Sequence, residues 1–418
     1  MARFEIHGGK PLSGEIRVSG AKNAALKFLA AALLTEEEVR LRNVPEIEDI
    51  KRMVEIIREL GVQVDHPEPH QYNIRAASLK TSVLSRELAP KIRPSMLLIG
   101  PLLVRTGSAT LPHPGGCAIG RRPTDLFVHG FRKLGATVEE GVDERIFRAG
   151  TLRGGRFVFP TPSVTATEAL MIMAVRTSGR TELVNVAMEP EIPALAEFLN
   201  SCGAKITGGG TPIIIIEGVD RIRGGEISIM PDRIEAGSFA ALAAATKSDL
   251  WIRGCNPKHL EVPLLMLEKI GVKFEVASDS IHVMPSDDLE AMNITTHEYP
   301  GFPTDLQAPF TVLLTQAKGV ALVHETIFEG RLFYIEHLNK MGAKIVLSDQ
   351  HRAVVEGPTP LRGSTLESPD IRAGLALVIA ALAAKGKSTI NNVYQIDRGY
   401  ERIEERLRAI SADIRRIE

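Results

Sequence analysis

Strongly apolar segments recur along the chain at nearly regular intervals. They consist mainly of Ala, Leu, Ile, Val and Met, and as helices they would be apolar on every side. Helices of that kind are typical of buried positions in a protein interior. The segments span residues 24–34, 96–104, 169–175, 239–245, 310–317 and 373–384. This pattern predicts six buried central helices.

Amphipathic helices and short strands alternate with these segments. In residues 49–60, the apolar side chains recur at the three- and four-residue spacing of a helix with one face on a core. Gly61 follows, and a glycine at this place supplies the left-handed residue that ends many helices. Residues 212–217 and 344–347 are predicted to be short strands.

A motif of an apolar residue, a glycine and another apolar residue shows that the chain is repetitive. Five copies and a degenerate sixth, with serine for glycine, follow one another at intervals of 68 to 74 residues. They lie at residues 60–62, 134–136, 202–204, 270–272, 341–343 and 410–412. A chain of 418 residues is too long for one ordinary core. The six units therefore predict two domains of three units each, with residues 230–236 as the best boundary.

The charge balance excludes several classes of partner. Fifty basic residues stand against 51 acidic ones, so the formal net charge is −1. No general positive field favours nucleic acid or a membrane surface. The N-terminus lacks a signal-peptide pattern, and the longest apolar run, 373–384, is too short to cross a bilayer. We expect a cytoplasmic protein.

Cations stand where several of the apolar helices begin. Lys22, Arg93 and Arg372 occupy these positions, although the positive end of a helix disfavours a cation. Helix N-termini bind anions, so the pattern predicts a cleft for a phosphate-rich ligand. Simpler interpretations remain open. Lys22 and Arg93 could be solvated charges, Arg372 could pair with Asp370 or Glu367, and Asp370 and Asp305 could be helix caps.

One cysteine lies in a glycine-rich, basic loop. Residues 114–123 read Pro-Gly-Gly-Cys-Ala-Ile-Gly-Arg-Arg-Pro, and nearby arginines favour the thiolate form of Cys117. Cys202 and Cys255 have the pattern of structural cysteines. Three cysteines without paired spacing predict neither a disulfide framework nor a metal site. No phosphate-binding loop or dinucleotide fingerprint is present in the chain.

Seven segments together give the chain a family resemblance from end to end. They are residues 19–23 (Ser-Gly-Ala-Lys-Asn), 114–123, 189–192, 231–235, 301–305, 370–373 and 396–404. In these segments the chain resembles the enolpyruvyltransferase family. The resemblance implies an α/β (α+β) fold with six β-α-β-α-β-β repeats that form two inside-out barrels around buried helices. It also implies domains at 22–229, with the Cys117 loop, and at 1–21 plus 230–418, with Asp305 and Arg398. The active site would lie in the cleft between them.

The resemblance also implies a reaction. The enolpyruvyl group of phosphoenolpyruvate would pass to the 3-hydroxyl of UDP-N-acetylglucosamine, through a tetrahedral ketal that releases phosphate. This is the first committed step of peptidoglycan synthesis. We expect no cofactor, and a monomer is favoured although the sequence leaves the oligomeric state open. Asp305 matches the base, and Cys117 matches an acid that can also add covalently. Lys22, Arg122 and Arg398 match a clamp on phosphoenolpyruvate.

Further positions match the surroundings of the two substrates. Arg93 and Arg372 would line the cleft, and Asp370 would act in closure or product release. The positions around the nucleotide sugar are Asn23, Pro123, Asp125, Leu126, Ser163, Val164, Asp305 and Ile327.

Three residues depart from the family pattern. Phe127 stands where histidine is frequent, yet it could stack on a base. Thr161 and Thr165 stand where lysine and glycine are frequent. Two alternatives therefore stay open. One is transfer to another acceptor, such as a different uridine nucleotide or shikimate 3-phosphate. The other is a non-catalytic paralogue that binds the nucleotide sugar.

Overall fold

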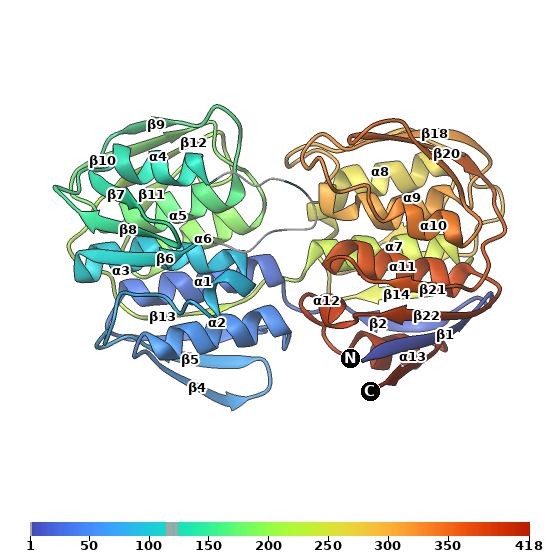
Figure 1. Cartoon of the computed structure of the whole chain (residues 1–418), viewed down its shortest axis with the longest axis horizontal. Coiled ribbons are helices and arrows are strands. Elements are labelled where there is room, and N and C mark those ends of the chain that lie inside the picture. Colours follow the sequence, from blue (N-terminus) through green and yellow to red (C-terminus); the bar gives the residue numbers. More distant parts are fainter. Residues whose placement is uncertain (1, 114–119, 121–123) are drawn as a thin grey trace. The chain divides into compact units, whose positions relative to one another are not determined.

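The structure, a computed structural model, describes residues 2–113, 120 and 124–418 and contains two compact units (Figure 1). The N-terminal unit comprises residues 20–113 and 124–230. The C-terminal unit comprises residues 231–418 together with the first strands of the chain, residues 2–19. Each unit has its own hydrophobic core, so each buries the apolar surface of its own helices.

Three central helices and three outer helices form the helical part of the N-terminal unit. The central ones are α1 (Lys22–Ala31), α3 (Ile99–Thr106), which continues the 3-10 helix η3 (Arg93–Leu98), and α5 (Val164–Ala174). The outer ones are α2 (Glu48–Glu59), α4 (Asp125–Lys133) and α6 (Glu191–Ser201). Short 3-10 turns occur at η1 (Ala32–Leu34) and η2 (Ala89–Lys91).

Three sheets complete this unit. Their orders are β13-β3-β5-β4, β6-β8-β7 and β11-β12-β10-β9, and most neighbours are antiparallel. The strands are β3 (Glu38–Arg42), β4 (Gln63–Glu68), β5 (Gln71–Arg75), β6 (Ser108–Pro112), β7 (Ala136–Glu140), β8 (Glu144–Ala149), β9 (Arg156–Val158), β10 (Arg180–Val184), β11 (Lys205–Thr207), β12 (Ile213–Glu217) and β13 (Gly225–Ser228). The predicted strand at 212–217 is thus confirmed as β12.

The C-terminal unit has the same organisation. Its central helices are α7 (Arg233–Ala245), α9 (Gln307–Leu314), which continues η5 (Thr304–Leu306), and α11 (Ile371–Ala383), and they contact one another. The outer helices are α8 (Glu261–Ile270), α10 (Ile335–Lys340), α12 (Tyr394–Asp397) and α13 (Ile403–Ala409), with a 3-10 turn at η4 (Pro257–Leu260).

Three four-stranded sheets surround these helices. Their orders are β15-β16-β14-β2, β17-β18-β20-β19 and β21-β22-β1-β23. The strands are β1 (Arg3–Gly8), β2 (Ser13–Arg17), β14 (Asp249–Arg253), β15 (Lys273–Val276), β16 (Ser280–Met284), β17 (Ile294–Thr295), β18 (Gly319–His324), β19 (Lys344–Leu347), β20 (Arg352–Gly357), β21 (Thr365–Glu367), β22 (Gly386–Asn391) and β23 (Asp413–Ile417). Because β1 pairs with β22 and β23, the start of the chain is part of this unit.

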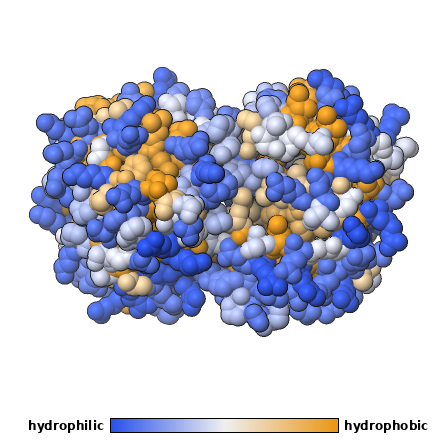
Figure 2. Space-filling model, turned by 180° about the vertical axis from the view of Figure 1, so that it is seen from behind, coloured by the Kyte–Doolittle hydropathy of each residue, from blue (hydrophilic) through white to orange (hydrophobic). Residues whose placement is uncertain are grey.

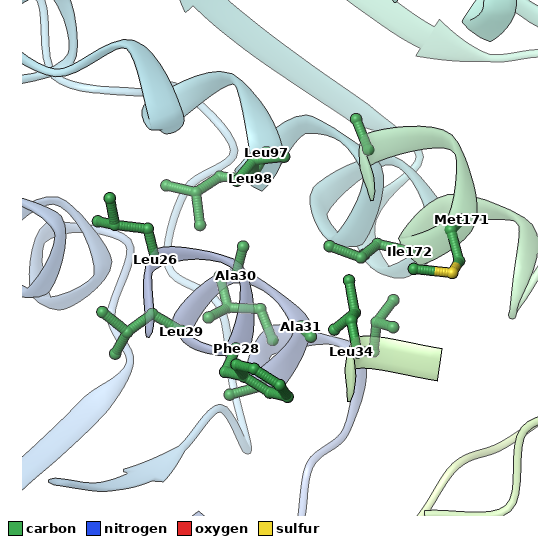
Figure 3. Packing of buried hydrophobic residues seen from close by; sticks show 14 of the residues in the cluster. Leu26, Phe28, Leu29, Ala30, Ala31, Leu34, Leu97, Leu98, Met171 and Ile172 are labelled. Atoms are coloured by element: carbon green, nitrogen blue, oxygen red, sulfur yellow. The ribbon is translucent and has the colours of Figure 1, made fainter. Parts of the chain in front are cut away.

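The six apolar segments are the buried helices of the two cores, as predicted. In α5 and α11 nearly every side chain is buried, whichever way it points. Figure 3 shows side chains of α1, including Leu26 and Phe28, packed with Leu97 and Leu98 of η3 and with Met171 and Ile172 of α5. Since these helices have no polar face, burial from all sides is the arrangement that removes their apolar surface from water.

The repeated glycine motif has the left-handed backbone that the sequence predicts. The glycines after α2, α4, α6, α8 and α10 have φ between 92° and 104°. The degenerate copy has Ser411 at φ 73°, so a residue with a Cβ adopts the same conformation, which is disfavoured for L-residues. The repeat therefore extends to the sixth unit at some local cost.

The surface is mostly hydrophilic, with separate hydrophobic patches (Figure 2). The exposed apolar residues include Val320, Val346 and Leu347, which lie on strands of one sheet of the C-terminal unit. Among the described residues, no helix is long and apolar enough to cross a membrane. In the same part of the chain, no cluster of three His, Cys, Asp or Glu residues is placed to hold a metal ion.

Candidate active site

The C-terminal unit contains a carboxylate held by two buried arginines. Nε of Arg372 donates to Oδ2 of Asp305 at 2.9 Å. The guanidinium of Arg331 binds the other oxygen, Oδ1, of the same carboxylate. Only 6% of the Arg372 side chain and 4% of the Arg331 side chain are exposed, against 24% for Asp305. The carboxylate is thus the member of the group that reaches solvent.

This arrangement decides the protonation state of Asp305. Burial alone would raise the pKa of the carboxyl group, but the charges and hydrogen bonds of Arg372 and Arg331 outweigh it and hold the pKa far below the usual value. Asp305 is therefore ionised at neutral pH. Two guanidinium groups also make it a weak base in this arrangement, because a proton would have to displace them.

Asp305 differs from the aspartates at the equivalent places of the two neighbouring helices. Asp232 caps α7 by accepting from the backbone N–H groups of Ile234 and Glu235. Asp370 caps α11 in the same way, at 2.8 Å from the N–H of Arg372. Asp305 lies in η5, where no side chain caps the helix. The carboxylate of Asp305 thus binds two arginine side chains instead of capping its helix.

Arg372 is fixed from a second side. Its Nη1 donates to the hydroxyl of Tyr400 at 3.0 Å, and burial raises the pKa of this phenol to about 12. Tyr400 thus remains a neutral partner. The expectation that Arg372 might pair with Asp370 or Glu367 is wrong, because Asp370 is engaged as a cap and the guanidinium extends to Asp305.

Two more predicted site residues belong to this unit. Ile327 is partly buried in the loop after β18, and its N–H donates to Oε1 of Glu325 at 2.9 Å. Arg398 is partly buried just beyond α12, where its guanidinium donates to Gln395 at 3.0 Å.

A second charged group begins the first central helix of the N-terminal unit. Lys22 is the first residue of α1, is only 8% exposed, and its Nζ lies 2.8 Å from Oδ2 of Asp49. Asp49 is buried in the first turn of α2. A protein carboxylate thus accompanies the cation at this helix start, and Lys22 is not a solvated charge.

The other predicted residues of this unit lie at the starts of neighbouring helices. Arg93 begins η3 and is partly buried, and Asn23 follows Lys22 in α1. Asp125 and Leu126 begin α4, and Ser163 caps α5, which begins at Val164. The segments contact one another in the order α1, η3, α5 and α4. The structure therefore gathers these residues on four packed helices.

Phe127 corrects one expectation. It is only 2% exposed and packs against Phe131, with ring centroids 4.4 Å apart, and against Phe147. An aromatic ring in this cluster belongs to the core and does not stack on a base. Thr161 is exposed and Thr165 is partly buried next to the cap of α5.

Cys117, Arg122 and Pro123 lie outside the described residues. The other two cysteines have the structural character expected of them. Cys202 and Cys255 are buried, and burial raises the pKa of both thiols, to about 11 for Cys255. Neither is a reactive thiolate at neutral pH.

Sequence reasoning did not find the partners that hold these groups. Arg331 is 26 residues from Asp305 and stands at no helix start, so no pattern marks it. The sequence pattern marks Asp49 only as a residue of an amphipathic helix. Its position 27 residues after Lys22 carries no signal of pairing. Both contacts depend on the tertiary packing of separate elements.

Comparison with known proteins places this chain in a family. Residues 6–407 match the model of EPSP synthase (3-phosphoshikimate 1-carboxyvinyltransferase). A UDP-N-acetylglucosamine 1-carboxyvinyltransferase of Koribacter versatilis is 44% identical over 100% of this chain and 97% of its own length. The chain belongs to the UDP-N-acetylglucosamine 1-carboxyvinyltransferase family. A member from Bartonella henselae is also 44% identical, with both chains covered completely. This identifies the chain as an enzyme of the carboxyvinyltransferase type and confirms the resemblance seen in the sequence.

A solved structure confirms the fold class. The enolpyruvyl transferase NikO from Streptomyces tendae superimposes with a TM-score of 0.89 at 25% identity, covering 99% of this chain and 98% of its own. The two chains therefore share one fold over nearly their whole lengths.

Proposed function

We propose that this chain transfers the enolpyruvyl group of phosphoenolpyruvate to the 3-hydroxyl of UDP-N-acetylglucosamine and releases phosphate. The observation that carries the proposal is the 44% identity, over the whole chain, with relatives named UDP-N-acetylglucosamine 1-carboxyvinyltransferase. The ionised Asp305 between two buried arginines is the chemistry that such a reaction uses. It provides a base for a hydroxyl group and cations for an anionic substrate.

The reaction begins with addition. The sugar oxygen forms a bond to C2 of phosphoenolpyruvate, a proton is added at C3, and the hydroxyl proton leaves to a base. Elimination then breaks the bond between C2 and the phosphate oxygen and removes a proton from C3, which gives the enol ether and phosphate. Asp305 accepts the hydroxyl proton in this scheme, and Cys117 donates the proton to C3.

The arginines explain how a carboxylate of low pKa can act as a base. Phosphoenolpyruvate carries a carboxylate and a phosphate, which compete with Asp305 for the guanidinium groups of Arg331 and Arg372. Once these groups turn to the substrate, the pKa of Asp305 rises, since less positive charge stabilises its ionised form. Substrate binding itself thus activates the base.

The residues of the N-terminal unit supply the remaining contacts in this proposal. Lys22, with Arg122 and Arg398, binds phosphoenolpyruvate, while Arg93 adds positive charge at a helix start. The nucleotide sugar contacts the start of α1 at Asn23, the start of α5 at Ser163 and Val164, and the start of α4 at Asp125 and Leu126, with Pro123 beside it. Ile327 and Asp305 complete the sugar site, and Asp370 acts in closure or product release. The proposal thus assigns residues of both units to the two substrates.

One observation favours testing a second acceptor. Phe127 is buried in an aromatic cluster and offers no ring to a base, and the family resemblance places this position beside the uracil. Thr161 and Thr165 also depart from the family pattern, so a different uridine nucleotide is the alternative acceptor, with the same addition and elimination.

The test is acceptor-dependent phosphate release from phosphoenolpyruvate. We expect release with UDP-N-acetylglucosamine and none with UMP or shikimate 3-phosphate. Release with UMP alone would assign the same chemistry to another acceptor. Silence with all three acceptors would contradict catalysis and leave a nucleotide-sugar-binding protein.

A further inference from the structure

Glu325 is a buried carboxylate that joins two segments of the C-terminal unit. It follows β18 directly and is 0% exposed. Its Oε1 accepts from the N–H groups of Ile327 and Phe328, at 2.9 and 3.1 Å, and from the hydroxyl of Thr296 at 3.2 Å. Its Oε2 accepts from the hydroxyl of Thr304 at 2.8 Å. A buried carboxylate with four donors is well satisfied, which is the condition for its burial.

The hydrogen bond from Thr304 to Glu325 is one of two contacts between the neighbourhood of Asp305 and the segment 325–331. Thr304 precedes Asp305 in η5, and Asp305 binds Arg331, six residues after Glu325. The segment 325–331 is therefore attached to η5 at both of its ends. Glu325 holds one end through Thr304, and Arg331 holds the other through the carboxylate of Asp305.

The two attachments differ in what a substrate does to them. An anionic substrate that binds Arg331 weakens the attachment at Asp305, because both compete for one guanidinium group. The bond between Glu325 and Thr304 involves a buried carboxylate and a neutral hydroxyl that already donates to it, so it offers no positive charge to an anionic substrate. It therefore persists when the arginines are engaged elsewhere.

We propose that Glu325 and Thr304 are positioning residues that keep Asp305 in place after its arginines turn to phosphoenolpyruvate. This inference rests on the proposed function, since it assigns Asp305 the role of base. The hydrogen bond restrains η5, so the carboxylate stays directed at the acceptor hydroxyl during proton transfer. Misplacement of a reacting group by about 1 Å lowers rates strongly. A hydrogen bond that prevents such a shift of the Asp305 carboxylate therefore supports catalysis.

The test compares Thr304→Val with Thr304→Ser. Valine has the shape of threonine without the hydroxyl, and serine keeps the hydroxyl. We expect Thr304→Val to lower kcat at least tenfold while both KM values change less than threefold, and Thr304→Ser to retain kcat within about threefold. Thr326→Val is the matched control, because this hydroxyl donates to the carbonyl of Thr296 and not to η5.

Amide hydrogen exchange gives a readout that does not need activity. We expect the amides of residues 304–306 to exchange faster in Thr304→Val than in Thr304→Ser, with phosphoenolpyruvate present. Unchanged kcat in Thr304→Val, equal loss in the valine and serine variants, or equal loss in Thr326→Val would overturn the inference. If the wild-type chain releases no phosphate with any acceptor, the proposed function fails. The exchange measurement tests the positioning role separately. Equal exchange at residues 304–306 in the valine and serine variants overturns that role whether or not the chain is active.

Discussion

Arg372 donates a hydrogen bond of 2.9 Å to Asp305, and the same carboxylate binds Arg331 on its other oxygen. The pair of Arg372 and Asp305 links the start of the third central helix, α11, to η5 at the start of the second. Burial raises the cost of an unpaired charge, so each member requires the others. The site is thus organised before any substrate arrives.

Removing the carboxylate charge tests the role of Asp305. Asparagine keeps one oxygen that can accept from one of the two arginines, but it cannot take a proton at neutral pH. We expect Asp305→Asn to lower kcat by about 10²- to 10⁴-fold, with the far-ultraviolet circular dichroism unchanged. Asp349→Asn is a matched control, because this exposed aspartate pairs with Arg352 on another surface of the same unit. Full activity of Asp305→Asn would contradict the assignment.

Removing one arginine should move a pH profile in a defined direction. Arg331 helps to hold the pKa of Asp305 far below its usual value, against the effect of burial. Arg331→Met removes that charge, so the pKa of Asp305 rises. The acid limb of kcat/KM should then move to higher pH by at least one unit.

The comparison needs an arginine with no link to Asp305. Arg253 pairs with Glu15 on the outer surface of the sheet that contains β14, so Arg253→Met should leave the pH profile where it is. An acid limb that does not move in Arg331→Met, or one that moves to lower pH, would contradict the electrostatic account.

Glu168 predicts a pH dependence of stability in the N-terminal unit. Burial raises the pKa of this fully buried residue to about 8, although Lys27, at 2.8 Å, opposes the shift. Between about pH 5 and 8 the folded state keeps a proton that the unfolded state has lost. The contribution of the protonated Glu168 to the free energy of unfolding is therefore fully present at low pH. It falls as the pH rises through this range, by about 1.4 kcal/mol per pH unit at most.

Glu168→Gln isolates this contribution. Glutamine does not ionise, so the variant lacks this loss of stability. Its free energy of unfolding minus that of the wild type should increase as the pH rises from 5 to 8. Urea unfolding at four pH values in this range measures the difference. Glu226→Gln, at an exposed surface pair with Arg42, should run parallel to the wild type. A Glu168→Gln curve that is also parallel would disprove the raised pKa.

Cys117 is tested by an alkylating inhibitor. An epoxide phosphonate such as fosfomycin should inactivate the wild type by reaction with this thiol. Cys117→Asp should stay active, because a carboxylic acid can donate a proton, and should resist the inhibitor. Cys202→Ser should stay sensitive, since Cys202 is buried with a raised pKa. Full inactivation of Cys117→Asp would rule out Cys117 as the target.

Much of the fold could be predicted because it depends on local signals. The central helices follow from segments without a polar face, and the ends of five outer helices follow from glycines with positive φ. Asp370 as a helix cap follows from its place before an apolar run. Such features need only the residue and its near neighbours in sequence.

The partners in the site could not be predicted in the same way. Asp305 and Arg331 meet because η5 and the loop after β18 are brought together by packing. Phe127 was misplaced because its aromatic character says nothing about burial. Its ring packs on Phe131 of the same helix and on Phe147 of β8, a separate strand. Contacts of this kind depend on the tertiary structure.

The most direct test of the central claim follows an oxygen atom. Phosphoenolpyruvate labelled with ¹⁸O at the oxygen between C2 and phosphorus is incubated with the enzyme and UDP-N-acetylglucosamine, and both products are analysed by mass spectrometry. We expect the label to leave with the phosphate, since the C2–O bond breaks, and the nucleotide sugar to gain an unlabelled enolpyruvyl group. Label that stays with the organic product, or phosphate released without any change in the nucleotide sugar, would contradict the central claim.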